Sequence, residues 1–318
     1  MRILSPIDRL DEVGPLVDAG VDELYGGFVP GAWLGRYSIM GSTNQRFFPG
    51  AQIKTEPELS RLISDAHRRG ARFYLVMNSQ FYTGPQYGEL LDQARRVDAL
   101  GADGFIVSDI GLILRLREAM PDAELHLSTL GTVFNGRSAA FFAGLGVKRM
   151  VFPRELTVAE MAGIVKANPG CEFDAFVLIG KCPNIEGYCG FTHNSPELVW
   201  PCEEAYRVEA VKGANGVDGI INAQMGWSRI NRRQACGLCA VSGLAGAGVT
   251  ALKLVGRGGP TAMKVKVAGA VRRMLDLAEN APSGHETHAA ARELYREIFG
   301  RGCNPYICYF PEVWRREG

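Results

Sequence analysis

The sequence of 318 residues contains no long hydrophobic run and no excess of one charge. No apolar run approaches the roughly 20 residues that cross a membrane. The opening MRILSPIDRLDEVGPL is too charged, and its apolar run too short, for a signal peptide. A net charge of +1, without a basic tract or an acidic tail, disfavours a nucleic-acid or membrane-surface binder. We therefore expect a cytoplasmic protein without a membrane span, and we do not expect nucleic acid among its partners.

The sequence also lacks the short motifs of several enzyme classes. No GxGxxG follows the first predicted strand, so a dinucleotide site has no support. HExxH and GxSxG are absent, which removes two common hydrolase signatures. The composition is 47% hydrophobic and 22% charged. That composition is ordinary for a globular protein, and the length allows a large buried core.

The dominant pattern is a short apolar run followed by an amphipathic stretch, repeated about eight times. Several runs follow a small residue and a glycine, as in AGVDEL and AGVTAL, which is typical of a helix end that leads into a strand. Runs that are apolar throughout predict parallel strands buried on both faces. We predict a TIM-like (β/α)8 barrel, with an open doubly wound sheet as the alternative. The predicted strands are 2–4, 22–27, 72–78, 104–108, 124–129, 148–152, 172–178 and 251–255, with helices at 57–69, 87–99, 109–118 and 157–167.

The predicted domain boundary lies near the C-terminus. Residues 1–280 should form the barrel, and residues 281–318 a C-terminal helix and tail packed on it. Between residues 179 and 240 the pattern breaks into a cysteine-bearing insertion after the seventh strand. A loop this long in a compact domain is usually functional. Because it follows a barrel strand, it should lie at the C-terminal mouth, where barrel enzymes carry their chemistry.

Eight cysteines are many for a chain expected in a reducing compartment, where they more often bind metals or act as catalytic thiols than form disulfides. Spacing leaves three interpretations open: a zinc site, an iron–sulfur cluster, or a nucleophilic cysteine with His193 as its base. The cysteines concerned are Cys182, Cys189, Cys202, Cys236 and Cys239. Only Cys236 and Cys239 have the short spacing that structural zinc sites favour.

A set of sequence blocks resembles peptidase family U32, the collagenase-like family. The blocks are ELYGG (23–27), YLVMN (74–78), GADGFIVSDIGLI (101–113), LHLSTLGTVFN (125–135), RMVFPRELTVAEM (149–161) and AGVTALKLVGR (247–257). The resemblance implies a relation to oxygen-independent hydroxylases that act on ubiquinone precursors, tRNA or ribosomal RNA. The ubiquinone-pathway subunits, whose first two cluster cysteines are seven apart, are the members this chain resembles most.

The resemblance also implies a [4Fe–4S] cluster, with prephenate as the possible oxygen donor. Carried over residue by residue, Cys182, Cys189 and Cys202 fall on the first three ligands. The fourth ligand lies in the family's "DLC" block, which places it at Cys236, with Cys239 in reserve. Cys303 and Cys308 fall outside this pattern.

Two departures from the family bear on the substrate. The stretch FVLIGKC lacks the family's HG before the first cysteine, and Val255 replaces an acidic residue of the family's KIEGR. If the replaced acidic residue contacts the family's usual substrate, the substrate here differs. The large catalytic extensions of the RNA-modifying members are absent, and with the net charge of +1 this favours a small organic substrate over RNA. The predicted substrate-binding residues, placed near strand ends, are Glu23, Tyr25, Asn78, Lys253 and Arg257.

The predicted function is that of an oxygen-independent hydroxylase or a hydroxylase subunit. Two alternatives stay open. One is a peptidase, as the family label says. The other is a non-catalytic iron–sulfur subunit that works with a paralogue as a heterodimer; a homo-oligomer is also open.

Overall fold

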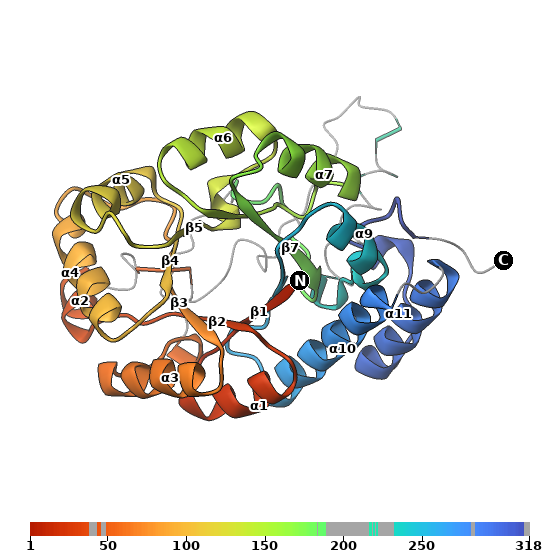
Figure 1. Ribbon diagram of the computed structural model, residues 1–318, viewed down its shortest axis with the longest axis horizontal. Helices are drawn as coiled ribbons and strands as arrows, with labels where there is room; N and C mark the ends of the chain where they lie inside the picture. The colour runs from red at the N-terminus through yellow and green to blue at the C-terminus, as the bar shows by residue number, and fades with distance from the viewer. Residues whose placement is uncertain are drawn as a thin grey trace.

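The computed structural model describes residues 1–37, 43–45, 49–182, 184–188, 216–217, 219, 221, 232–280 and 284–314. Eight parallel strands close into a barrel in their order along the chain (Figure 1). β8 pairs back with β1, so that Arg2 lies opposite Ala251. The predicted TIM-like barrel is confirmed. Its strands are β1 (Arg2–Pro6), β2 (Glu23–Gly26), β3 (Arg72–Met77), β4 (Gly104–Val107), β5 (Leu125–Leu127), β6 (Arg149–Val151), β7 (Glu172–Leu178) and β8 (Ala251–Leu254).

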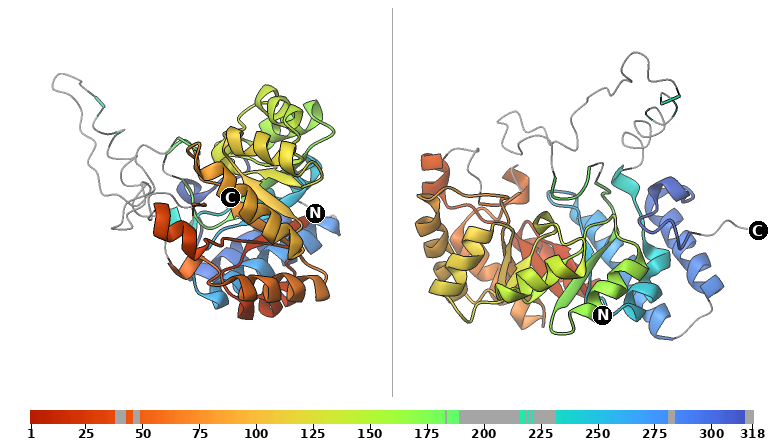
Figure 2. Two further views of the ribbon diagram at one scale, coloured as in Figure 1. Left: turned by 90° about the vertical axis from the view of Figure 1, so that its left-hand side faces the viewer. Right: turned by 90° about the horizontal axis from the view of Figure 1, so that it is seen from above.

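Helices surround the barrel, and side-chain caps fix where several of them begin (Figures 1 and 2). Asn135 and Thr157 each form a capping box with the residue three positions on, which satisfies free backbone N–H groups. The helices are α1 (Val13–Asp18), α2 (Gly31–Tyr37), α3 (Glu56–Arg68), α4 (Gln86–Ala99), α5 (Ile110–Ala119), α6 (Gly136–Gly144), α7 (Val158–Ala167), α9 (Val241–Gly246), α10 (Thr261–Glu279) and α11 (Gly284–Phe299). The four predicted helical stretches correspond to α3, α4, α5 and α7.

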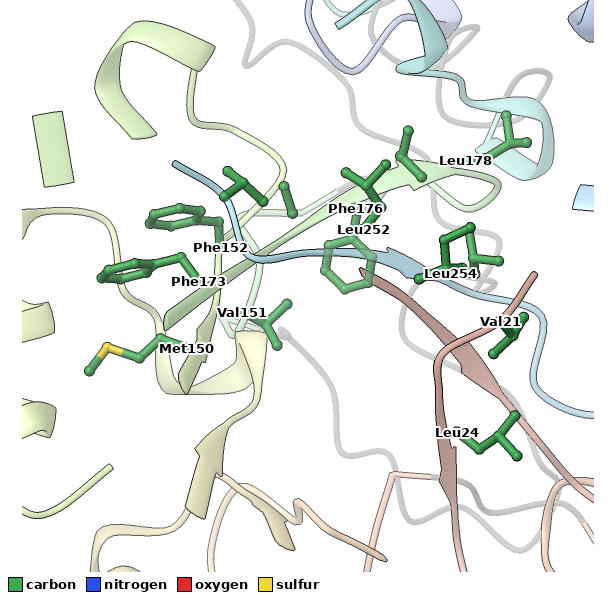
Figure 3. Packing of buried hydrophobic residues seen from close by; sticks show 14 of the residues in the cluster. Val21, Leu24, Met150, Val151, Phe152, Phe173, Phe176, Leu178, Leu252 and Leu254 are labelled. Carbon is green, nitrogen blue, oxygen red and sulfur yellow. The ribbon is translucent and has the colours of Figure 1, made fainter. Parts of the chain in front are cut away.

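The main hydrophobic core lies between the strands and the surrounding helices. Figure 3 shows part of it, where side chains of β6, β7 and β8 pack together. Phe152 and Phe173 stack there, with ring centroids 4.7 Å apart. Inside the barrel a smaller apolar cluster fills the space between the strands: Leu4, Tyr25, Tyr74, Val76 and Ile106.

The C-terminal segment packs against one side of the barrel. α11 contacts α10 and the short 3-10 helix η6 (Leu238–Ala240). Figures 1 and 2 show α11 outside α10. The division at residue 280 stays a prediction. Within the described residues, no helix is long and apolar enough to cross a membrane.

Candidate functional site

A chain of hydrogen bonds links four loops at the C-terminal ends of the strands. Asn78, which follows β3, donates from Nδ2 to Ser128 Oγ after β5 (3.0 Å). Its Oδ1 accepts from the backbone N–H of Gln45 (3.0 Å), and the Gln45 carbonyl accepts from Arg257 Nη1 (2.5 Å). The C-terminal ends of barrel strands are where such enzymes place their active sites. The structure thus brings two of the predicted substrate residues, Asn78 and Arg257, to one mouth.

The loop that carries Arg257 is fastened to the first loop of the chain. The N–H of Gly258 donates to Asp8 Oδ2 (2.7 Å), and Gly258 has a φ of 65°, a left-handed value that favours glycine. Lys264 Nζ, on α10, bonds Asp8 and both carboxylate oxygens of Glu12 (3.0 and 2.9 Å). All three charged side chains are buried. Charges buried in this way are costly unless paired, so the cluster holds the loop in one place.

Tyr25 and Lys253 lie deeper, inside the barrel. Both are buried, and Lys253 Nζ lies 3.5 Å from the centroid of the Tyr25 ring, a cation–π contact. The Tyr25 hydroxyl donates to the carbonyl of Leu254 (2.7 Å). These contacts tie β2 to β8 and place both side chains below the mouth. Substrate binding by Tyr25 and Lys253 stays a prediction.

Glu23 does not lie where the sequence placed it. It begins β2 instead of ending a strand, so its side chain enters the opposite end of the barrel. There it accepts two hydrogen bonds from the buried guanidinium of Arg149 (2.5 and 3.0 Å). Arg149 also donates from Nε to Glu172 (2.9 Å). Because this ion pair occupies Glu23 far from the mouth, we leave the residue out of the substrate set.

Two titratable groups near this ion pair have shifted pKa values. Burial raises the pKa of Asp174 to about 7, although Arg149 opposes the shift. Both carboxylate oxygens of Asp174 accept no hydrogen bond from the described residues. Burial lowers the pKa of His126 to about 4, so the imidazole is neutral at pH 7. The sequence did not single out Arg149 or Asp174, because their partners come from distant strands.

The loops after β3 and β7 are joined at the rim of the mouth. Gln80 Nε2 donates to the carbonyl of Gly187 (2.6 Å). This bond sets the loop with Phe81 beside the loop with Tyr188, and these two rings are 61% and 65% exposed. Ile185, also exposed, lies in the second loop. The joined loops therefore present apolar side chains to solvent.

The segment around residue 186 is held by contacts with Arg154 and Glu155. Glu186 is buried and pairs with Arg154, whose guanidinium lies 3.5 Å from the centroid of the Phe176 ring. The N–H of Glu186 donates to Glu155 Oε1 (3.0 Å), and burial raises the pKa of Glu155. The rim loop is thus fixed to residues that follow β6.

Two of the four predicted cluster ligands lie in described residues. The strand-like residues around Cys236 run antiparallel to the end of β7, where the N–H of Ile179 donates to Ala235 O (2.8 Å) and that of Gly237 to Val177 O (2.7 Å). Cys182 follows shortly after and is half-buried. The fold thus brings Cys236 to the part of the chain that leads into the cysteine loop. Cys189 and Cys202 lie outside the described residues, so the ligand set stays a prediction.

Cys236 also belongs to a second group of cysteines. It lines a small, almost wholly apolar cavity together with Cys239, Cys303 and Cys308. Burial raises the pKa of Cys239 to about 12 and that of Cys308 to about 11, so both are neutral thiols at pH 7. In the part of the chain that the structure describes, no three His, Cys, Asp or Glu side chains are arranged to hold a metal ion.

Comparison with known proteins finds relatives named for RNA hydroxylation. The chain is 29% identical over 224 residues to tRNA hydroxylation protein P of Haemophilus influenzae, covering 70% of this chain and 45% of that protein. It is 28% identical over 214 residues to the Escherichia coli protein of the same name, covering 65% and 43%. The 23S rRNA 5-hydroxycytidine C2501 synthase of Escherichia coli is 27% identical over 139 residues, covering 43% and 20%. The chain thus spans less than half the length of these relatives.

These relatives contradict the prediction of a small-molecule substrate without nucleic acid among the expected partners. That prediction relied on a net charge of +1. A net charge sums the whole surface and does not report the residues around one mouth.

The model of peptidase family U32 matches residues 8–313, nearly the whole chain. The resemblance drawn from the sequence blocks is therefore confirmed. The chain belongs to peptidase family U32.

Proposed function

We propose that this chain is the barrel domain of an RNA hydroxylase, which adds oxygen to a base of tRNA or ribosomal RNA. The proposal rests on the names of its relatives. The three relatives described above are all named for the hydroxylation of tRNA or ribosomal RNA. The peptidase alternative has no motif in its favour, since the sequence has neither HExxH nor GxSxG. Whether the chain works with a paralogous subunit stays a prediction.

The exposed rings at the rim support RNA as the substrate. Proteins bind unpaired RNA bases by stacking them on aromatic side chains. Phe81 and Tyr188 are both more than half exposed, and the Gln80–Gly187 hydrogen bond holds their loops together beside the mouth. A base stacked on either ring would lie at the C-terminal end of the barrel, where the reaction is expected.

The iron–sulfur cluster stays part of the proposal. Its predicted ligands Cys182, Cys189 and Cys202 follow β7 in the sequence, and Cys182 comes four residues after the end of that strand. Such a cluster would supply the redox chemistry. The fourth predicted ligand, Cys236, pairs with Leu178 at the C-terminal end of β7, and it also lines a cavity with three other cysteines.

The test of the proposal is oxygen transfer to RNA. The chain, expressed in an Escherichia coli strain without its own tRNA hydroxylation protein P, should restore a nucleoside one oxygen heavier in digests of tRNA or ribosomal RNA. A double variant, Phe81→Ala with Tyr188→Ala, should lower RNA affinity roughly 5- to 150-fold, since one stacked base contributes about 1–3 kcal/mol.

The matched control is Phe141→Ala, because Phe141 is an exposed ring (52%) on α6. It should bind RNA like the unaltered chain. RNA that gains no oxygen under any condition, with the chain folded and loaded with iron, would refute the function. A double variant that binds RNA as tightly as the Phe141→Ala control would refute the role of the rim.

Arg257 is our candidate for the carboxylate of the oxygen donor. Prephenate, the donor that the family resemblance implies, is a dicarboxylate, and a guanidinium can hold a carboxylate through two hydrogen bonds. Arg257 lies at the mouth, held by the Gln45 carbonyl. Arg257→Ala should weaken prephenate binding about 10- to 150-fold, since a charged hydrogen bond contributes about 1.5–3 kcal/mol. Calorimetric titration measures this.

The control for this change is Arg137→Ala, an exposed arginine on α6. The melting temperature of both variants should match that of the unaltered chain. If Arg257→Ala lowers the melting temperature and leaves the prephenate Kd unchanged, Arg257 serves the fold and not the donor.

A further inference from the structure

Four cysteines from two distant segments meet around one cavity. Cys236 and Cys239 are separated by two residues, and Cys303 and Cys308 by four. All four line the same cavity, together with apolar side chains such as Ile307 and Phe310. No local pattern in the sequence joins the two pairs, because more than sixty residues lie between them.

Backbone hydrogen bonds hold the two segments together independently of the thiols. The N–H of Cys236 donates to Ile307 O (2.9 Å), and the Cys236 carbonyl accepts from the N–H of Tyr309 (2.9 Å). Cys236 and Cys308 thereby form a parallel bridge. Cys239 lies within the 3-10 turn η6, and Cys303 and Cys308 stand on either side of a second 3-10 turn, η7 (Pro305–Ile307). The fold therefore fixes the backbone from which all four thiols project.

The size and lining of the cavity suit a single ion. Its volume is about 20 Å³, near the room that one water needs. The lining is almost wholly apolar apart from sulfur, so a water there would find few hydrogen-bond partners. A metal ion that binds sulfur would find four possible ligands there. A cluster of four irons and four sulfides needs more space than this cavity has.

Burial disfavours the free thiolates, but several groups nearby would stabilise sulfur that carries negative charge. The N–H of Leu238 donates to Cys236 Sγ (3.5 Å), and the N–H of Phe310 donates to Cys308 in the same way, two residues on. Lys181 Nζ donates to the Cys308 carbonyl (3.0 Å), and Arg292 interacts electrostatically with Cys239. Hydrogen bonds and charges of this kind orient metal ligands and tune them from outside the coordination sphere.

We propose that Cys236, Cys239, Cys303 and Cys308 bind one zinc ion as four thiolates. The spacings of two and four residues both fall in the range of structural zinc sites. The thiols line the cavity without converging on one point, so the ion would draw the sulfurs inward and displace their protons. This assigns Cys236 to zinc and leaves Cys182, Cys189 and Cys202 as the cysteine ligands of the proposed cluster.

The zinc would fasten the C-terminal tail to the end of β7. The Tyr309 hydroxyl already donates to the carbonyls of Ile179 (2.5 Å) and Gly180 (3.1 Å), at the start of the cysteine loop. Glu312 accepts from the N–H of Val158 (3.0 Å) at the first turn of α7. A tail held in this way sets the path of the chain into Cys182. The site is structural, and it does not depend on the RNA activity.

Metal analysis of the full chain, purified without oxygen, tests the proposal. The unaltered chain should contain about one zinc per chain besides its iron. Cys236→Ser and the pair Cys303→Ser with Cys308→Ser should lose the zinc and keep the iron. Cys182→Ser should do the reverse, and Cys171→Ser should keep both metals, since Cys171 lies at the start of β7, away from the cavity. Cobalt in place of zinc should give the charge-transfer absorption of four thiolates.

A second measurement, on the unaltered chain, tests the site even if the variants fail to fold. In the unaltered chain, alkylation should modify the four cysteines only after a chelator has removed the zinc. The proposal fails if the chain contains no zinc, if zinc survives loss of Cys303 and Cys308, or if these changes remove iron instead. It fails also if mass spectrometry finds the four sulfurs paired as disulfides. Loss of RNA hydroxylation with zinc intact would count against the proposed function and not against this site.

Discussion

Replacement of Arg149 by methionine is expected to lower the free energy of unfolding by roughly 3–5 kcal/mol. Arg149 is completely buried inside the barrel. Its guanidinium holds Glu23 through two hydrogen bonds and Glu172 through a third. Methionine matches the apolar stem but leaves Glu23, which is also fully buried, with Arg2 at 3.3 Å as its cation. A buried charge that loses its main partner carries most of its desolvation cost uncompensated.

Urea denaturation of the variant measures this loss, and Arg137→Met on the surface of α6 is the control, expected to change stability by under about 0.5 kcal/mol. Glu23→Gln in the Arg149→Met background should restore part of the loss, because the unpaired charge is then gone. A loss below about 1 kcal/mol for Arg149→Met, or no recovery in the double variant, would show that the pair is not what stabilises this end of the barrel.

The second large effect concerns pH. Burial raises the pKa of Asp174 from its ordinary value of 3.8 to about 7. Between these values the native state keeps a proton that the unfolded state has lost, so stability falls as pH rises from about 4 to 7. Asp174→Asn carries no such proton. The variant should therefore gain on the order of 3–4 kcal/mol relative to the unaltered chain between pH 4 and pH 8.

His126 acts in the opposite sense over part of this range. Its pKa is lowered to about 4, so the native state excludes a proton that the unfolded state binds below pH 6.5. Its contribution is lost as pH falls from 6.5 to 4. Comparison of two chains that both contain His126 removes this slope. Asp98→Asn, an exposed change on α4, is the control. A difference between Asp174→Asn and the unaltered chain that stays constant with pH would rule out the shifted carboxyl.

The barrel could be read from the sequence because its strands are buried on both faces. KRMVF and EFDAFVL are almost continuous apolar runs, and a glycine before a strand marks the end of the preceding helix. The same runs hid the buried charges. Arg149 and Asp174 are charged residues in otherwise apolar strands, and nothing in the sequence marks them as buried. Arg149 pairs with Glu23 of β2 and lies 3.8 Å from Asp174 of β7, and no local pattern joins these three residues.

The site was predictable only where it is local in sequence. Asn78 and Arg257 stand out because they follow strand ends, and the barrel brings all strand ends to one mouth. The rim is different. The loops that carry Phe81 and Tyr188 are joined by a hydrogen bond between Gln80 and Gly187, more than one hundred residues apart. Cys303 and Cys308 likewise gain a place only when the tail pairs with residue 236.

The closure of the barrel has a consequence for how the chain folds during synthesis. β1 pairs with β2 early, but its other edge pairs with β8, about 250 residues later. Until residues 251–254 leave the ribosome, that edge of β1 presents unpaired N–H and C=O groups to the cell. Over the same interval Asp8 and Glu12 lack Lys264, the cation with which they pair in the folded chain. An emerging sheet with an open edge invites pairing with other chains. The pairing of the first strand with the last is therefore the step that leaves this chain most open to contact with other chains before it folds.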